Sequence, residues 1–107
     1  LEERLARRFR ELARSPTPEA LHAYRRALRR VRYAKELLGF PAREEKRLQE
    51  ALGAFGDLEV LRGLLLAYPG AGRDLEAQAF LREVEKEREK AWHRALRALD
   101  LGLTELP

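Results

Sequence analysis

The chain has 107 residues, a formal net charge of +4 and no cysteine. This length suits one domain with a single core, and the lack of cysteine excludes disulfide bonds and thiolate-bound metals. No apolar run is long enough to span a membrane and no signal peptide opens the sequence, so we expect a cytoplasmic protein.

Two helices are predicted in the first part of the chain. The first covers Leu1 to Arg14, where apolar residues recur at helical spacing: Leu1, Leu5, Phe9 and Leu12. It has no capping residue at its start and the sequence contains no methionine, so we expect the complete protein to begin upstream of Leu1. The second helix runs from Pro18 to about Leu38, with Thr17 as a favourable N-cap and Gly39 where a C-cap glycine is expected.

Two longer helices are predicted from near Ala42 to about Ala67 and from about Asp74 to Leu99. The third helix has seven expected core positions, namely Leu48, Ala51, Leu52, Phe55, Leu58, Leu61 and Leu65. Its interior also contains Gly53 and Gly56, which predict a close helix contact or a kink. The fourth helix has an apolar stripe that includes Phe80 and the core residue Trp92, and the tail from Asp100 to Pro107 is predicted to be irregular.

No strand pattern competes with these four helices. Amphipathic helices joined by short connections predict an all-α fold, specifically an antiparallel up-down four-helix bundle with long helices. We expect residues 1–107 to form it as a single domain.

The second predicted helix has an unusual charge pattern. From His22 to Lys35 it contains six formal cations and no acid. An ordinary solvated helix face interleaves acids with bases to relieve repulsion, and this face does not. The pattern therefore indicates a row of guanidinium groups that binds an extended polyanion, since the planar fork of arginine can hold two phosphate oxygens at once.

Two sequence blocks resemble those of a known family. The first block is H-x-x-R-x-x-x-R-R-x-R-Y, formed by His22, Arg25, Arg29, Arg30, Arg32 and Tyr33. The second block is L-G-A-F-G-D-L-E-V-L, from Leu52 to Leu61. Both are similar to segments of the CHAD domain (conserved histidine α-helical domain), in the order and at about the spacing of that family. The resemblance covers about Leu21 to Leu66 and implies binding of inorganic polyphosphate or a similar linear polyanion.

The resemblance also implies how the ligand is held. Members of the family usually carry two helical halves, each with its own histidine–arginine helix, and the ligand lies between them. Only one such helix occurs here, so either a second half-domain is missing or two chains associate as a homodimer to complete the groove. The motif makes Asp57 the acid that orients an arginine of the second helix, although it could be an ordinary surface aspartate. The preceding Gly56 departs from the family, which often has Arg or Asn there.

The predicted polyphosphate-binding residues lie on two helices: His22, Arg25, Arg26, Arg29, Arg30, Arg32, Tyr33, Lys90 and Arg94. Lys90 and Arg94 could supply another wall of the groove, although the sequence does not show which way they face. Alternatives remain open for the second helix. Its basic row could be a solvated face, Arg26 and Arg30 could pair with acids of the third or fourth helix, and His22 could cap or pack near the helix start.

No set of catalytic residues, glycine-rich phosphate loop or carboxylate cluster for Mg²⁺ appears, so we expect neither an enzyme nor a cofactor. A metal site is not expected, because His22 and His93 are the only histidines and no acids converge on either in sequence.

Polyphosphate is favoured over nucleic acid because Tyr33 is the only aromatic residue on the basic face. The alternatives are a nucleic-acid-binding helical module, an accessory domain of a triphosphate-processing enzyme, and a structural bundle without an anionic ligand.

Overall fold

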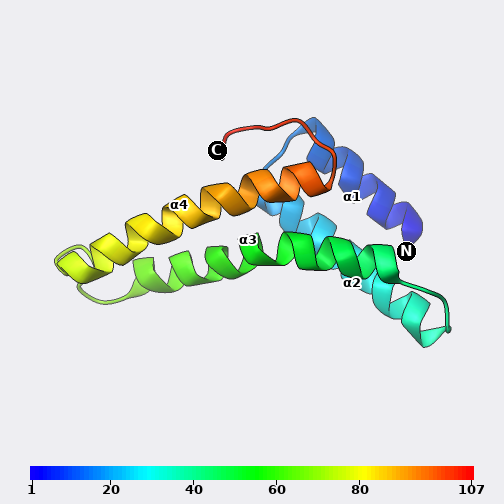
Figure 1. Cartoon of the computed structure of the whole chain (residues 1–107), viewed down its shortest axis with the longest axis horizontal. Helices are drawn as coiled ribbons and strands as arrows, with labels where there is room; N and C mark the ends of the chain where they lie inside the picture. Colours follow the sequence, from blue (N-terminus) through cyan, green and yellow to red (C-terminus); the bar gives the residue numbers. More distant parts are fainter.

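The computed structural model describes residues 1–107 and contains four helices and no strand, so the protein is all-α (Figure 1). The helices are α1 (Glu2–Arg14), α2 (Pro18–Leu37), α3 (Arg43–Ala67) and α4 (Leu75–Ala98). Every predicted helix end lies within one residue of the observed end, and the tail after α4 is irregular, as predicted. None of the four helices is both long enough and apolar enough to cross a membrane.

Local signals determine where the helices begin and end. The side chain of Thr17 accepts a hydrogen bond from the backbone N–H of Ala20 at 3.1 Å, and Asp74 accepts one from that of Glu76 at 2.9 Å. These bonds satisfy amide groups that have no partner in the first helical turn. Gly39 follows α2 with a φ of 80°, a left-handed conformation that glycine adopts without steric cost. The predicted cap at Thr17 and the glycine at the end of α2 are therefore confirmed.

The helices form two hairpins. Figure 1 shows α1 and α2 running in opposite directions in one hairpin, and α3 and α4 side by side, again in opposite directions, in the other. Close backbone contacts join α1 with α2, α2 with α3, and α3 with α4, which is consistent with the predicted bundle. The molecule is elongated, 51 × 29 × 18 Å along its principal axes, because the far end of the α3–α4 hairpin extends beyond the α1–α2 hairpin (Figure 1).

A single core joins the helices where the two hairpins cross. Its largest fully buried side chains come from every helix: Leu12, Leu21, Leu28, Leu52, Trp92 and Leu96. The ring centroids of Trp92 and Phe55 are 5.2 Å apart, and the indole N–H of Trp92 donates a hydrogen bond to the carbonyl oxygen of Thr104 at 2.8 Å. Trp92 is thus a core residue, as predicted, and it also holds the C-terminal tail.

The far end of the α3–α4 hairpin is less buried than its apolar pattern predicts. Of the seven core positions expected in α3, only Leu52 and Phe55 are buried, and the others are half-buried. Phe80, on the predicted apolar stripe of α4, is 49% exposed. The reason is that helical periodicity identifies an apolar face but not whether another element covers it, and here the α1–α2 hairpin reaches only part of α3 and α4.

Candidate functional site

Helix α2 presents its basic residues outward because its apolar face is buried. Tyr24, Leu28 and Val31 are at most 5% exposed and belong to the buried interior. On the opposite side, Arg25 and Arg32 are half-buried, and five predicted site residues are exposed: His22, Arg26, Arg29, Arg30 and Tyr33. The cations predicted from the charge pattern therefore lie on the side of α2 that faces away from the core.

Arg25 lies across helix α3 at Gly56. A Cβ atom at Gly56 would lie 2.7 Å from the central guanidinium carbon of Arg25, which is closer than van der Waals contact allows. The buried Nε atom of Arg25 has no hydrogen-bond partner, and no carboxylate pairs with its guanidinium group. Gly56 thus provides the space in which a half-buried, unpaired cation rests on the backbone of α3.

The pKa of Arg25 reflects this position. Burial lowers the pKa of its guanidinium group, and the charge of Arg29 lowers it further, while the charge of Asp57 acts in the opposite direction. Arginine nevertheless stays protonated in proteins, so Arg25 remains a cation. A partly desolvated cation beside a second cation is a favourable position for an incoming anion, because the anion relieves both the lost hydration and the repulsion.

A hollow of about 390 Å³ lies beside Arg25, between α2 and α3. Its lining includes His22 and Arg25 from α2 and Phe55, Gly56 and Glu59 from α3. The structure therefore brings His22 and Arg25 to the same depression, as their motif positions imply. Two acids also line the hollow: Glu59, which forms an ion pair with Arg88, and the exposed Glu19, which forms none.

Arg32 differs from the other arginines of α2 because it has partners within the chain. Its Nε–H donates a hydrogen bond to Glu36 at 2.6 Å, and its NH1 group donates one to Gln49 of α3 at 3.0 Å. The bond to Glu36 is the main cause that raises the pKa of Arg32. Arg32 also lies 5.6 Å from the ring centroid of Tyr33. It is thus a partly neutralised end of the basic row.

A second group of cations lies on the other side of α2, facing α1. A hollow of about 350 Å³ between these helices has no acid in its lining and five arginines: Arg4, Arg7, Arg8, Arg26 and Arg30. Of these five, only Arg8 forms an ion pair, with Glu11 at 3.0 Å. Arg26 and Arg30 therefore do not pair with acids of α3 or α4. The arginines of α1 were missed in the sequence, although their spacing of three and four residues places them on one helix face.

Three further predicted residues are not joined to the basic row by direct contacts. Asp57 is exposed and forms no hydrogen bond or ion pair with an arginine, so it acts on Arg25 only through its charge. Lys90 lies 3.4 Å from Glu87 in an exposed ion pair, and Arg94 is exposed. Helix α4 makes no close backbone contact with α2, and none of the larger hollows combines Lys90 or Arg94 with the cations of α2.

The contact between Arg25 and Gly56 gives a prediction. Replacing Gly56→Ala should displace the guanidinium of Arg25 and weaken binding of an anionic polymer about threefold to tenfold, because a pre-positioned side chain becomes mobile. Thermal stability should be unchanged or higher, since alanine favours a helix over glycine by up to ~1 kcal/mol. Melting curves and a binding titration check both expectations.

Gly53→Ala is the matched control for that prediction. Gly53 lies in the same helix with no atom near its missing Cβ, so this variant has the same helix propensity change without touching Arg25. Equal affinities of the two variants would show that the position of Arg25 over Gly56 does not matter for binding.

Comparison with known proteins places this surface in a family. The family model described as the CHAD domain matches residues 1–66, which include α1, α2 and all but the last residue of α3. No curated protein and no solved structure matches the chain. The matched segment covers more than half of the sequence and contains both motifs as well as the arginines that line the two hollows. The chain therefore belongs to the CHAD-domain family.

Proposed function

We propose that the protein is a binding module for a linear phosphate polymer, with inorganic polyphosphate as its ligand. One observation carries the proposal, namely that four arginines of α2 have no acidic partner: Arg25, Arg26, Arg29 and Arg30. Their charges are uncompensated within the chain, and arginine binds phosphate oxygens through a planar, bidentate fork. The family supports this ligand, because CHAD domains are associated with polyphosphate- and triphosphate-related proteins.

The spacing of these arginines suits an extended ligand. Arg25 and Arg29 are four residues apart, which corresponds to about 6 Å along the helix axis, so both can contact one chain at successive positions. His22 continues this line toward the start of α2 and lines the same hollow as Arg25. Arg26 and Arg30 offer a second, parallel line that the cations of α1 extend.

Nucleic acid is the competing ligand, and the surface favours it less. Proteins that bind single strands combine basic grooves with aromatic side chains on which bases stack, at about 1–3 kcal/mol per base. Tyr33 is the only aromatic residue among the predicted site residues, and the cation of Arg32 already lies near its ring. Inorganic polyphosphate has no bases, so its affinity does not depend on aromatic side chains for stacking.

We also propose that the protein acts by binding alone and that a second unit completes the groove. The second unit would be the other half-domain usual in the family or a second copy of this chain. Large apolar side chains are exposed at the far end of the α3–α4 hairpin, which supports a partner there: Leu64, Leu66, Tyr68, Leu75 and Phe80. Hydrolysis of pyrophosphate or triphosphate by the isolated chain would contradict the proposal that the protein acts by binding alone. A monomer in sedimentation experiments with and without polyphosphate would exclude the homodimer.

A salt-dependent competition experiment tests the proposed ligand. Polyphosphate should displace a single-stranded RNA of matched charge, whereas the RNA should displace polyphosphate poorly at equal phosphate concentration. If three to five phosphates are neutralised, the logarithm of the affinity should fall with the logarithm of salt concentration with a slope between about −2 and −3.5. Preferential binding of the RNA would favour the nucleic-acid module, and a flat salt dependence would exclude an electrostatic surface.

A further inference from the structure

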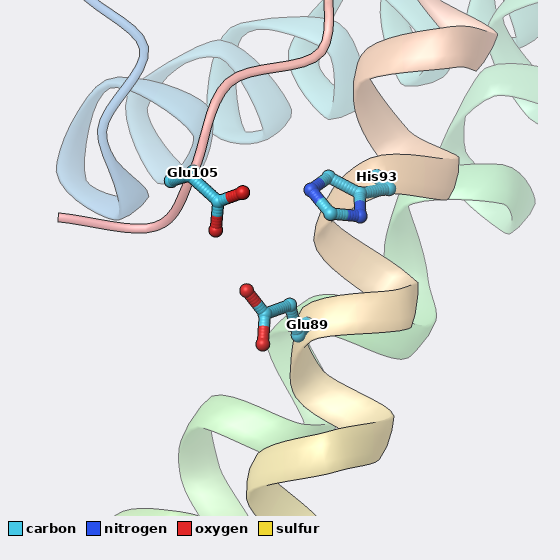
Figure 2. Close-up of side chains that lie close together, drawn as sticks. All are labelled: Glu89, His93 and Glu105. Carbon is cyan, nitrogen blue, oxygen red and sulfur yellow. The ribbon is translucent and has the colours of Figure 1, made fainter.

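Three side chains outside the basic surface converge on one side of helix α4. Glu89 and His93 lie four residues apart on α4, and Glu105 lies on the tail that follows the helix. Each offers one ligand atom, and these atoms lie within 4.8 Å of one another. Figure 2 shows the two carboxylates and the imidazole ring pointing toward a common space between the tail and the helix.

The position of Glu105 is fixed by its neighbours on both sides. The carbonyl oxygen of Thr104 accepts the indole N–H of Trp92 at 2.8 Å, and Leu106 packs against the hydrophobic core. Farther back, the backbone N–H of Leu101 donates a hydrogen bond to the carbonyl oxygen of Leu96 at 2.8 Å. Glu105 is therefore held over α4 by an anchored segment, and its approach to His93 is not that of a loose chain end.

The charge balance of α4 also distinguishes this cluster. Glu83, Glu85 and Glu87 each form an ion pair with a lysine or arginine. Glu89 forms none, and neither does Glu105, although the two carboxylates lie close together. Two nearby carboxylates that form no ion pair repel one another, and a cation between them would remove that cost.

We infer that Glu89, His93 and Glu105 form a binding site for a divalent transition-metal ion of the Zn²⁺ class. An imidazole with two carboxylates suits such ions, whereas Mg²⁺ and Ca²⁺ prefer oxygen ligands alone. Zn²⁺ bonds to these atoms are about 2.0–2.2 Å long, so the side chains need to close by only about 1 Å. Residues Glu89 and His93 form an i, i+4 pair that can hold an ion from one helix face.

The bound ion would fasten the C-terminal tail to α4. The site lies apart from the two hollows of the proposed polyphosphate surface, because none of its three residues lines either hollow. The sequence did not indicate it, since Glu105 and His93 are separated by the end of the helix and the reversal of the chain at Asp100, which has a φ of 59°. Only the fold brings the third ligand to the other two.

Titration with ZnCl₂, in a chain without a histidine tag and above neutral pH, tests the site. Calorimetry should show one ion bound per chain, and the affinity should fall at least about tenfold in His93→Gln and in Glu105→Gln. Glu87→Gln is the matched control, because it also removes one carboxylate from α4. Glu87 pairs with Lys90 outside the cluster, so this variant should bind Zn²⁺ as tightly as the unmodified chain does.

Trp92 provides a second readout. It is the only tryptophan of the chain and contacts the tail, so its fluorescence should change on addition of the ion and not in His93→Gln. Undiminished Zn²⁺ affinity in both His93→Gln and Glu105→Gln, or no saturable binding below millimolar concentration, would overturn the inference. Circular dichroism of both variants separates a lost ligand from a lost fold, and Glu105 lies on an exposed position where substitution leaves the core unchanged.

Discussion

Replacing Arg25 and Arg29 together by glutamate is expected to abolish polyphosphate binding while the helical content stays unchanged. The substitution removes two cations from the outer face of α2 and puts two acids in their place. Each charge-assisted hydrogen bond to phosphate contributes about 1.5–3 kcal/mol, so the loss should reach about 100-fold or more even before repulsion is counted. Neither residue is part of the core, and neither forms an ion pair that the fold would lose.

A matched double variant separates position from net charge. Arg73 and Arg82 are exposed and form no ion pair, and they lie in the loop before α4 and in the first half of α4. Replacing both by glutamate makes the same change in net charge away from α2, and polyphosphate should still bind with at most a small loss. Equal losses of affinity in the two double variants would mean that binding depends on the net charge of the chain and not on the position of the arginines. Retained affinity in the Arg25/Arg29 variant would refute the proposed site.

Replacing Trp92→Ala is expected to destabilise the protein by about 3–5 kcal/mol, because it leaves a cavity in the core and frees the tail. Trp92 is fully buried, contacts Phe55 and donates the hydrogen bond that holds Thr104. For a domain of this size the melting temperature should fall by more than about 10 °C. Thermal and urea denaturation followed by circular dichroism measure the change.

Phe80→Ala is the matched control on the same helix. It also removes a large aromatic side chain, but one that is 49% exposed, so its cost should stay below about 1 kcal/mol. Trp92→Phe keeps most of the volume and loses the hydrogen bond, which should cost about 1–2 kcal/mol. A loss for Trp92→Ala no greater than that for Phe80→Ala would show that the two hairpins do not share a core at this residue.

The helices could be predicted from the sequence because their ends are set by neighbours in the chain. Thr17 and Asp74 cap the next turn, and Gly39 ends α2 through its own backbone conformation. These are local effects that a sequence contains in full. The tertiary surroundings of the apolar positions are not local, so the exposure of Phe80 could not be predicted in the same way.

The basic face of α2 was also predictable, because it follows from periodicity and charge within one helix. What each cation contacts depended on the fold. Arg32 finds Gln49 seventeen residues away, and the prediction of a free guanidinium row does not hold at that position. The interior glycines predicted a close approach, and at Gly56 the approaching group is the side chain of Arg25, whereas nothing lies near Gly53.

The arginines of α1 show the same limit from the other direction. In the sequence they are mixed with Glu2, Glu3 and Glu11, as on an ordinary solvated helix. Only the register of α1 against α2 decides that Arg4, Arg7 and Arg8 line one hollow with Arg26. Helix register depends on side-chain packing across the interface, which no pattern within a single helix records.

Each helix makes close backbone contacts only with the helices before and after it in the chain, and most close backbone contacts join residues that are near in sequence. Such a topology has a low contact order, and helical proteins of this kind fold within microseconds to milliseconds.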